Sequence, residues 1–442
     1  MNERSDGVYP RDLGDVFLIR GGRIVTPSGT VKGDLIAEGG EISAIGGDLS
    51  GYGPDNAATI DAEGLWVVPG LVDIHCHLRE PGDEHKEDIA SGVSAAAKGG
   101  FTLVCCMANT NPVNDNAVVT EFIKRRAERA GPVRVLPIAA VTKGLRGEEL
   151  TEMGEISEAG AAAVSDDGKS IRNARVMRLA LSYAKRFGLV VVSHPEDEDL
   201  ADGGVMNEGY WSTALGLPGA TRAAEEVVIA RDCMLAALEN SRLHIAHVST
   251  AGGVEIVRQA KRMGAPVTCE TAPHYLYATD EWARGYDPNT KVNPPLRTDR
   301  DREALIEALS DGVIDCIATD HAPHHADDKN VEYALASSGI SGFETALAVC
   351  WTALVKTARM TPEELIRKLS EAPSSVLGLD AGRLEVGKRA DITIIDPSAE
   401  WVVDPEKFAS RGRNTPFAGH TLTGLVKCTV AGGKAAYWGF EP

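Results

Sequence analysis

Short apolar runs alternate with longer amphipathic segments through the middle of the chain. The apolar runs have the length of strands, and the spacers at residues 117–130, 174–187 and 251–263 are long enough for helices. This alternation is typical of repeated βα units, whose strands form a parallel sheet. Eight candidate strands can be counted, at Leu71–His77, Phe101–Met107, Val133–Ala139, Ala161–Asp166, Leu189–His194, Leu243–His247, Ala265–Glu270 and Ile314–Asp320. The pattern predicts an α/β fold of the (β/α)8 TIM-barrel type, in which active sites lie at the carboxyl ends of the strands.

An open doubly wound sheet is the alternative for such a pattern. It would be favoured by a glycine-rich phosphate loop after the first strand, and the sequence has none at that position. After the eighth strand, residues 342–360 and 361–377 are predicted to form two helices. The second opens with Thr361 as a cap residue and Pro362 at the first helical position.

The two ends of the chain have a different sequence pattern. Residues 16–25 and 34–45 contain short runs of alternating apolar and polar residues, with Gly-Gly pairs that suit hairpin turns. The same pattern occurs in residues 382–396 and 425–438. Neither end is long enough to bury two sheet faces alone, so we expect both ends to form one small β-sandwich.

The predicted domains are a barrel at residues 67–380 and a composite β-sandwich at residues 1–66 and 381–442. A chain of 442 residues, 43% of them hydrophobic, is ample for one large core and an accessory piece. With 45 Lys and Arg against 64 Asp and Glu, the net charge of −19 argues against general binding to nucleic acid or to an anionic membrane. The polar residues 1–7 and the lack of a long apolar stretch predict a cytoplasmic protein. The eight cysteines lie mostly in apolar runs without zinc-ribbon spacing, which predicts buried, reduced thiols.

Histidines and aspartates follow five of the eight predicted strands at their carboxyl ends. The first strand ends in His75 and His77, which share a face because alternate side chains of a strand point the same way. An isolated pair of this kind would more often be two ordinary polar residues, but later strands add candidates that would meet it at one end of a barrel. These further candidates are Asp166 or Asp167, His194, His247 and Asp320.

This set predicts a shared metal site. Four histidines and two carboxylates exceed what one tetrahedral ion needs, since catalytic zinc keeps a position open for water, and two ions would use them all. The imidazole-rich donors favour zinc over magnesium or calcium, although manganese and cobalt could replace it in vitro. Strand alternation does not decide between Asp166 and Asp167. His85, His244, His274 and His420 are predicted to be structural, since His244 lies an odd number of residues from His247 on its strand.

Six motifs of the chain occur together in a known family. They are His75-Cys-His-Leu-Arg-Glu-Pro-Gly, Met107-Ala-Asn-Thr-Asn-Pro, Ser165-Asp-Asp-Gly, Ala246-His-Val-Ser-Thr, Val292-Asn-Pro-Pro-Leu-Arg and Ala318-Thr-Asp-His-Ala-Pro-His. In this combination the sequence resembles the amidohydrolase superfamily, and specifically the bacterial class I dihydroorotases, over nearly the whole chain.

The resemblance implies a cyclic amidohydrolase with two zinc ions per subunit. Relatives that act on hydantoins or dihydropyrimidines generally bridge the two ions with a carboxylated lysine, whereas this chain has an Asp-Asp-Gly in that region. The implied ligands are His75, His77 and Asp320 for one ion, His194 and His247 for the other, and Asp167 as the bridge.

The implied activity is the reversible cyclisation of N-carbamoyl-L-aspartate to L-dihydroorotate in de novo pyrimidine biosynthesis. Asp320 is the expected catalytic residue, because a carboxylate beside a dication stays ionised and can carry a proton to the leaving nitrogen. The alternative for Asp320 is a plain ligand without a proton-transfer role. The expected partners are the small-molecule substrate and further copies of the chain, and association with a carbamoyltransferase stays open.

The substrate is anionic, so a cationic side chain should bind its carboxylate. Arg79 lies two residues after His77, where its guanidinium could form a bidentate pair with that group. The resemblance adds His77, Asn109, Asn293 and His324 as substrate contacts. Asn109 and Asn293 lie near prolines and could instead be turn-formers, and His324 competes with His321 and His325.

One motif departs from the family pattern. Class I dihydroorotases often carry Pro-Phe-Gly where this chain has Ser337-Ser338-Gly339. Backbone amides could still serve the substrate ring, so Ser338 and Gly339 are kept as expected contacts.

Two rival functions compete with this one. A hydrolase of hydantoin, allantoin or dihydropyrimidine would use the same scaffold, but those rings lack the carboxylate that Arg79 would bind. A catalytically silent homologue that scaffolds a carbamoyltransferase would lack metal ligands, and here all six ligand positions are filled.

Overall fold

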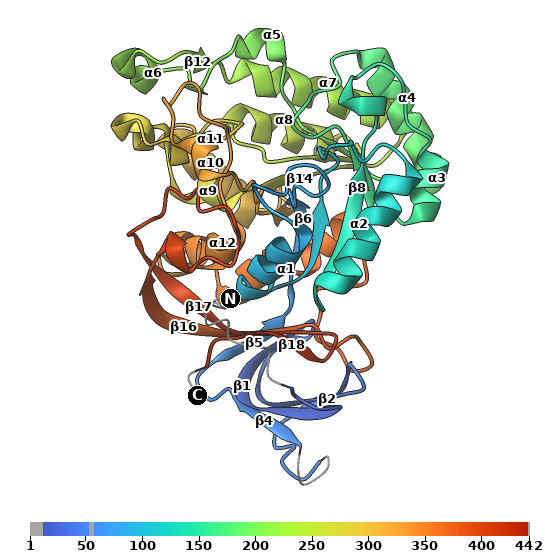
Figure 1. Ribbon diagram of the computed structural model, residues 1–442, viewed down its shortest axis with the longest axis vertical. Helices are drawn as coiled ribbons and strands as arrows, with labels where there is room; N and C mark the ends of the chain where they lie inside the picture. The colour runs from blue at the N-terminus through green and yellow to red at the C-terminus, as the bar shows by residue number, and fades with distance from the viewer. Residues whose placement is uncertain (1–11, 53–56, 441–442) are drawn as a thin grey trace, which may run out of the picture.

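The larger part of the molecule is a parallel eight-stranded barrel surrounded by helices (Figure 1). The computed structural model describes residues 12–52 and 57–440. The barrel strands are β6 (Leu71–Cys76), β7 (Phe101–Cys106), β8 (Arg134–Ala139), β9 (Ala163–Ser165), β10 (Val191–Ser193), β13 (Leu243–Ile245), β14 (Val267–Thr271) and β15 (Cys316–Ile317). They neighbour one another in this order. Backbone hydrogen bonds from Asp320 to His75 and from His77 to His321 close the ring, so the predicted (β/α)8 barrel is confirmed.

Helices follow the strands and cover the outside of the barrel. They are α1 (Ile89–Lys98), α2 (Ala117–Ala130), α3 (Met153–Ala159), α4 (Ala174–Ala184), α7 (Ala223–Glu239), α8 (Ala251–Arg262), α10 (Asp299–Ser310) and α12 (Phe343–Cys350). Their apolar faces share one buried cluster with the strands, for example through Ile123 of α2 and Val257 of α8. The three helix-length spacers of the sequence correspond to α2, to α4 with the 3-10 turn η2 (Lys185–Phe187), and to α8.

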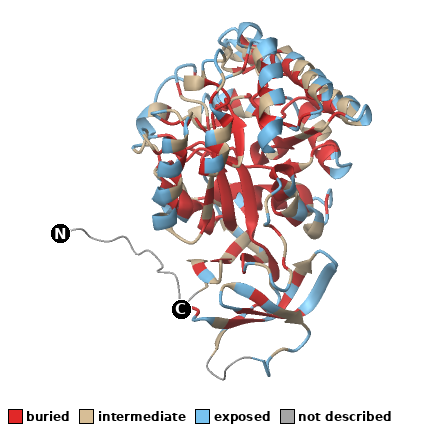
Figure 2. Ribbon diagram, turned by 90° about the vertical axis from the view of Figure 1, so that its right-hand side faces the viewer, coloured by how far each residue is buried: buried red, intermediate tan, exposed pale blue. Residues whose placement is uncertain are grey.

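The barrel interior is filled by side chains, and its strands are among the most deeply buried parts of the molecule (Figure 2). Val72 of β6 and Ile138 of β8 belong to the interior cluster. The helix α14 (Glu371–Leu377) adds Val376 to the same cluster, and Arg242, directly before β13, donates a hydrogen bond to the Val376 carbonyl. The amino end of the barrel is therefore closed, as packing at that end serves stability.

Both ends of the chain contribute strands to a second, mixed sheet. These strands are β1 (Val16–Thr26), β2 (Gly29–Glu38), β3 (Glu41–Gly46), β4 (Ala58–Asp61), β5 (Trp66–Pro69), β16 (Ile392–Val402), β17 (Thr421–Ala431) and β18 (Lys434–Trp438). The order is β18-β17-β16-β5-β1-β2-β3, with β4 paired to β1. A separate apolar cluster joins Phe17 and Leu35 from one end to Ile394 and Val430 from the other. The accessory β domain is thus built from both ends, as predicted.

The mixed sheet lies against the amino ends of the first barrel strands. Gly70, directly before β6, donates its N–H to the Asp391 carbonyl at 2.9 Å, and the Thr393 hydroxyl donates to Gly100 O, before β7, at 2.7 Å. The opposite end of the molecule in Figure 1 carries α5 (Glu198–Ala201), β11 (Met206–Asn207), α6 (Tyr210–Leu215) and β12 (Gly219–Ala220). The carboxyl ends of the strands are therefore free to carry functional loops.

The second helix predicted after the barrel is divided in two. Thr361 caps α13 (Pro362–Leu369) with a reciprocal Thr361–Glu364 capping box and with Pro362 in the first turn, as predicted. The helix ends at Ser370, whose backbone is non-helical (φ −135°, ψ −81°), and α14 follows. Pro373 explains the break, because in a continuous helix its ring would clash with the carbonyl of Leu369.

Short helical segments occur in the remaining connections. They are η1 (Lys143–Leu145), α9 (Pro273–Tyr277), η3 (Asp280–Gly285), η4 (Pro288–Thr290), α11 (Ala326–Lys329), the π-helical turn η5 (Trp351–Val355) and η6 (Pro405–Lys407). No helix in the described part of the chain is both long and apolar enough to cross a bilayer. The polar residues 1–7 lie outside the described residues.

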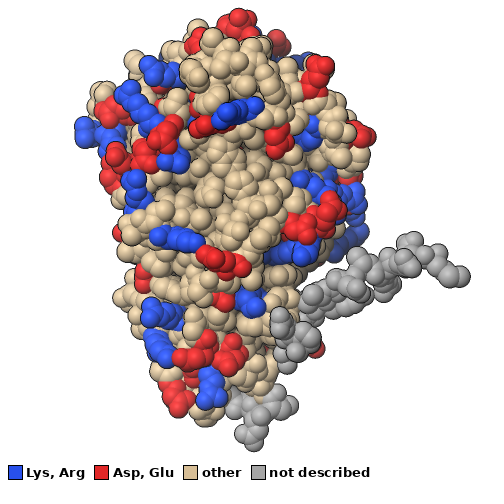
Figure 3. All heavy atoms as spheres, turned by 90° about the vertical axis from the view of Figure 1, so that its left-hand side faces the viewer, with Lys and Arg blue, Asp and Glu red and all other residues tan. Residues whose placement is uncertain are grey.

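The positions of the cysteines and of the charged side chains agree with what the composition predicts. All eight cysteines are buried and unpaired, in line with the prediction of reduced thiols. On the face drawn in Figure 3, basic and acidic side chains are interleaved around an uncharged middle. That face therefore presents no broad basic surface of the kind that binds a polyanion.

Candidate functional site

The loops at the carboxyl ends of the barrel strands surround a cavity of about 450 Å³. His75 lies beneath it and is fully buried. The cavity is lined by the other residues expected from the sequence, which are His77, Arg79, Asn109, Asp167, His194, His247, Asn293, Asp320, His324, Ser338 and Gly339. The structure thus brings the whole predicted set to one place.

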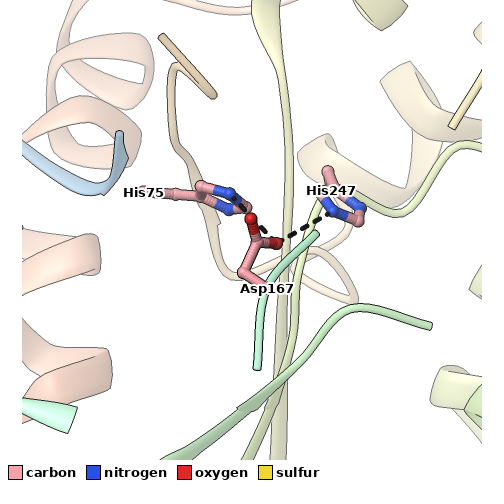
Figure 4. Close-up of side chains that lie close together, drawn as sticks. All are labelled: His75, Asp167 and His247. Atoms are coloured by element: carbon pink, nitrogen blue, oxygen red, sulfur yellow. Dashed lines mark ion pairs between the residues drawn. The ribbon is translucent and has the colours of Figure 1, made fainter. Parts of the chain in front are cut away.

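Asp167, the second residue after β9, lies between His75 and His247 (Figure 4). Its Oδ1 is 3.4 Å from His75 Nε2, 3.4 Å from His194 Nδ1 and 3.5 Å from His247 Nε2. Its Oδ2 is 3.4 Å from His77 Nε2. One carboxylate therefore faces all four imidazoles, two from each half of the predicted ligand set.

Asp166 points away from this cluster. Its Oδ1 accepts hydrogen bonds from Val141 N at 2.8 Å and Thr142 N at 2.9 Å, and its Oδ2 accepts one from the Thr142 hydroxyl. The carboxylate thereby ties the β8 loop to the β9 loop. The geometry makes Asp167, rather than Asp166, the residue placed between the histidines.

Asp320 completes the cluster from the loop after β15. Its Oδ1 lies 3.3 Å from His77 Nε2 and 3.6 Å from His75 Nε2. Asp320 and His247 both adopt positive φ, 47° and 33°, which is strained for residues other than glycine. Such strain is held in place by the surrounding structure and is common at active sites.

Both central aspartates stay ionised. Burial alone would raise the pKa of Asp167, but the charge of His75 and the proximity of the other imidazoles hold that pKa well below its usual range. Burial is likewise outweighed at Asp320, whose pKa is lowered by His77 and His75. For His194, burial opposes protonation, yet Asp167 and Glu196 raise its pKa to about 10. Each carboxylate is therefore a strong ligand for a cation.

The donor set fits a divalent metal. The six carboxylate–imidazole distances given above are 3.3–3.6 Å, close to the separation of about 3.4 Å between two ligand atoms that share a tetrahedral ion at about 2.1 Å. His75 Nε2, Asp167 Oδ1 and His247 Nδ1 are buried without a hydrogen-bond partner. Two groups have donor atoms close enough to hold an ion, His75–Asp167–His247 and His75–His77–Asp320.

Glu270 is a site residue that the sequence reasoning missed. Its Oε1 lies 2.6 Å from His75 Nδ1, and its Oε2 lies 3.1 Å from His244 Nε2. A carboxylate on the far nitrogen of a ligating histidine fixes the tautomer and the ring orientation. The sequence contains one indication of this role. Glu270 ends the seventh predicted strand, and no other site residue is predicted on that strand.

His244 lies on β13 and is fully buried. His247 lies beyond the strand with φ 33°, so the expected strand alternation does not relate the two side chains. Its Nδ1 lies 2.8 Å from the Thr268 hydroxyl, and its Nε2 contacts Glu270. His244, Glu270 and Cys316 also have donor atoms close together. Because both ring nitrogens of His244 are already paired within the protein, we assign it a structural role.

Two polar residues of the cavity wall contact His77 and His194. Asn109 Oδ1 is 2.9 Å from His77 Nδ1, so Asn109 orients this ring. Glu196, also missed from the sequence, lies 3.4 Å from His194 Nε2 and accepts a hydrogen bond of 3.1 Å from Asn293 Nδ2. Its position two residues after His194 was the only local signal.

Arg79 and His324 form the side of the cavity next to Asp320. Arg79 Nε donates to the Pro323 carbonyl at 3.1 Å, and its Nη2 lies 3.4 Å from His324 Nε2. His324 Nε2 is also 2.8 Å from the Ser338 carbonyl. Burial and the charge of Arg79 lower the pKa of His324 to about 2, which keeps the imidazole neutral.

Only one of the three histidines in the loop after β15 lines the cavity. His321 stacks on Phe343 at 4.0 Å between ring centroids and turns away from the cavity. The side chain of His325 is 47% exposed and lies beside Asp327. Gly339 has φ 142°, and a Cβ there would lie 2.6 Å from the Ala322 carbonyl, so only glycine fits.

The sequence matches two family models and close relatives along most of its length. A model described as dihydro-orotase-like matches residues 64–252, and one described as amidohydrolase family matches residues 220–437. A dihydroorotase of Acetivibrio thermocellus is 52% identical over 420 residues, which cover 95% of this chain and 98% of the relative. A dihydroorotase of Geobacter metallireducens is 51% identical over 423 residues, which cover 95% and 99%.

Solved structures share the fold. An L-hydantoinase (dihydropyrimidinase) from Arthrobacter aurescens superposes with a TM-score of 0.87, at 26% identity and 96% coverage of both chains. A dihydropyrimidinase from Brevibacillus agri, 23% identical with a TM-score of 0.83, has the same fold. With relatives about half identical over nearly their full length, the chain belongs to the dihydroorotase family of amidohydrolases.

Proposed function

We propose that the chain catalyses the reversible cyclisation of N-carbamoyl-L-aspartate to L-dihydroorotate, with two zinc ions in the Asp167-centred site. The observation that carries this proposal is a cavity that combines Arg79, a cation suited to a carboxylate, with Asp167, Asp320 and the four histidines around them. The relatives named dihydroorotase, about half identical in sequence, support the same reaction.

The two ions would be held by residues that already face one another. The expected division is His75, His77 and Asp320 on one side, His194 and His247 on the other, and Asp167 between them. Bound zinc would supply Lewis acidity, which polarises a carbonyl and lowers the pKa of water. The mixture of imidazole and carboxylate donors suits zinc better than magnesium or calcium.

Asp320 is placed to carry the proton. Its carboxylate lines the cavity and is held ionised, so it can accept a proton from water in the ring-opening direction. It then gives that proton to the ring nitrogen as the C–N bond breaks. In ring closure the steps reverse, and Asp320 accepts the proton of the carbamoyl nitrogen as this atom bonds to the side-chain carboxyl carbon.

Arg79 would bind the carboxylate that takes no part in ring closure. A guanidinium pairs with a carboxylate through two parallel hydrogen bonds, which orients as well as attracts it. His77, Asn109, Asn293 and His324, together with the backbone of Ser338 and Gly339, would complete the contacts to the substrate. Hydantoin and dihydropyrimidine rings lack this carboxylate, so the cavity would favour dihydroorotate.

The first experiment is an assay combined with metal analysis on the purified protein. We expect about two zinc ions per chain and turnover of dihydroorotate without turnover of hydantoin. Turnover of hydantoin at a similar rate, or activity in a metal-free preparation, would contradict the proposal.

Arg79→Met gives the matched variant for the substrate class. We expect kcat/KM for N-carbamoyl-L-aspartate to fall about 100-fold, the cost of losing hydrogen bonds to a charged group. Zinc content should stay at the wild-type value, because Arg79 holds no metal. Unchanged kinetics would show that the carboxylate binds elsewhere.

The proposal also covers the compartment and the oligomeric state of the enzyme. Eight unpaired, buried thiols suit a reducing compartment, which supports a cytoplasmic enzyme. We also propose a homo-oligomer, and light scattering on the purified protein measures its mass.

A further inference from the structure

Lys329, the last residue of α11, has a buried ammonium group with three carbonyl partners. The residue is 6% exposed and is not among the residues that line the cavity. Nζ donates to Ser337 O at 2.7 Å, to Pro288 O at 3.0 Å and to Lys291 O at 3.3 Å. An ammonium group has three N–H donors, so every donor of Lys329 is used.

The three carbonyls belong to two separate segments of the chain, residues 288–293 and 334–339. Lys329 therefore joins these two segments. Two further bonds join them, from Gly339 N to Lys291 O at 2.9 Å and from Lys291 Nζ to Ala334 O at 2.8 Å. The carbonyl of Lys291 thus accepts from both Lys329 and Gly339.

Both segments carry residues that line the cavity. Asn293 belongs to the first, and Ser338 and Gly339 belong to the second. The second segment also meets His324, whose Nε2 lies 2.8 Å from the Ser338 carbonyl and 3.4 Å from Arg79 Nη2. A continuous chain of contacts therefore leads from Lys329 to the expected carboxylate-binding side chains.

The charge of Lys329 has no ion-pair partner among the described residues within 4.0 Å. Burial and then the neighbouring Lys291 lower the pKa of Lys329 to about 7, while Asp287 and Asp328 act in the opposite direction. Burying an unpaired cation is unfavourable. This unfavourable burial occurs where residues 288–293 meet residues 334–339.

We propose that Lys329 is a positioning residue for substrate recognition, which fixes residues 334–339 against residues 288–293 so that Ser338, Gly339 and His324 meet the substrate held by Arg79. This inference rests on the proposed function. Lys329 itself does not line the cavity, and its Nζ donates to backbone carbonyls of Pro288, Lys291 and Ser337. Its loss should therefore loosen substrate binding and leave the metal site intact.

Lys329→Met tests the inference, because methionine fills similar space without donors or charge. We expect KM for N-carbamoyl-L-aspartate and for dihydroorotate to rise about tenfold, with kcat within about twofold of wild type. Zinc content should be unchanged. An unchanged KM in the folded variant would overturn the proposal, and so would a fall in zinc content that accounts for the lost activity.

Lys368→Met is the matched control. Lys368, on α13, also donates from a partly buried ammonium to a backbone carbonyl, Ile314 O at 2.7 Å, but it lies near the amino end of β15. We expect this variant to lose stability while KM stays at the wild-type value. A similar rise of KM in both variants would mean that Lys329 acts only through general stability.

Hydrogen exchange gives a readout that does not require activity. Peptides that cover residues 334–341 should exchange faster in Lys329→Met than in wild type, because the Gly339–Lys291 bond is less well held. Equal exchange in the two proteins would overturn the proposal for Lys329, whether or not the protein is active. A wild-type protein that is inactive on dihydroorotate would instead contradict the proposed function. If Lys329→Met does not fold, the neutral Lys329→Gln variant, which keeps two donors, is measured in the same way.

Discussion

At the scale of single residues, Glu270 shows how the protein prepares a histidine for a metal. The carboxylate is shared by His75 and His244, and all three side chains are fully buried or nearly so. Coulomb attraction to His75 and hydrogen bonds from His244 and His75 overcome the effect of burial and lower the pKa of Glu270 to about 2. His75 Nε2 is thereby directed at Asp167 before any ion arrives.

Glu270→Gln should weaken metal binding. The amide cannot accept hydrogen bonds at both of its ends, so His75 loses part of its orientation, and losses of about tenfold or more in metal affinity are typical for such residues. The measurement is zinc retained after dialysis against a graded series of chelator concentrations. Glu344→Gln is the control, since Glu344 is also buried but pairs with Lys98 away from the site. Equal zinc retention in both variants would contradict the role given to Glu270.

Asp320→Asn should remove proton transfer. An amide oxygen is a far weaker base than a carboxylate, so we expect kcat to fall by at least about 100-fold. Circular dichroism should show a folded protein, because the backbone bond from Asp320 N to His75 O does not depend on the side chain. Rates near the wild-type value would leave Asp320 as a ligand only.

At the scale of elements, apolar periodicity identified every barrel strand but not its length. The predicted strands ran into the loops, whereas β9, β10 and β13 have three residues each and β15 has two. Hydrogen bonding across a curved barrel, rather than side-chain pattern, decides where a strand ends, and a single sequence does not contain that information. The same limit applies to Ser370, where Pro373 divides a helix that periodicity alone predicts to be continuous.

The sequence predicts those site residues that lie at the ends of barrel strands. His75, His77, His194, His247 and Asp320 needed only the rule that carboxyl ends of barrel strands converge. Asp167 was preferred over Asp166 by resemblance, and the structure supplies the reason in the hydrogen bonds of Asp166. Glu196 and Lys329 depend on contacts between distant loops, which strand patterns do not reveal.

At the scale of the whole molecule, Asp391 links the mixed sheet to the barrel. Its carboxylate accepts hydrogen bonds of 3.0 Å from Arg134 Nη2 at the start of β8, 3.0 Å from Arg389 Nε and 2.8 Å from Gly432 N. Asp391 is 6% exposed, whereas the side chains of Arg134 and Arg389 are 33% and 42% exposed. The accessory sheet is therefore attached to the barrel end that lies opposite the cavity.

Asp391→Ala should destabilise the protein without changing catalysis. Losing hydrogen bonds to a charged group costs about 2 kcal/mol, which corresponds to a drop of a few degrees in Tm, measured by calorimetry. KM and kcat at 25 °C should match the wild type. Asp380→Ala, which removes an exposed partner of Lys388, should leave Tm nearly unchanged. A large change of KM in Asp391→Ala would mean that the sheet influences the cavity.

The pairing of β5 with β16 also constrains how the chain folds as it is synthesised. Residues 66–69 bond to residues 392–395 along one edge of β5. This edge stays unpaired until residues 392–395 have been synthesised, whereas β1 is already available to pair with the other edge. The first barrel strand follows β5 at once and is made long before the sheet beneath it can close. Contacts so distant in sequence form slowly, and unpaired strand edges are prone to aggregate in the meantime. The nascent chain thus has an extended period in which one edge of β5 is open to chaperones.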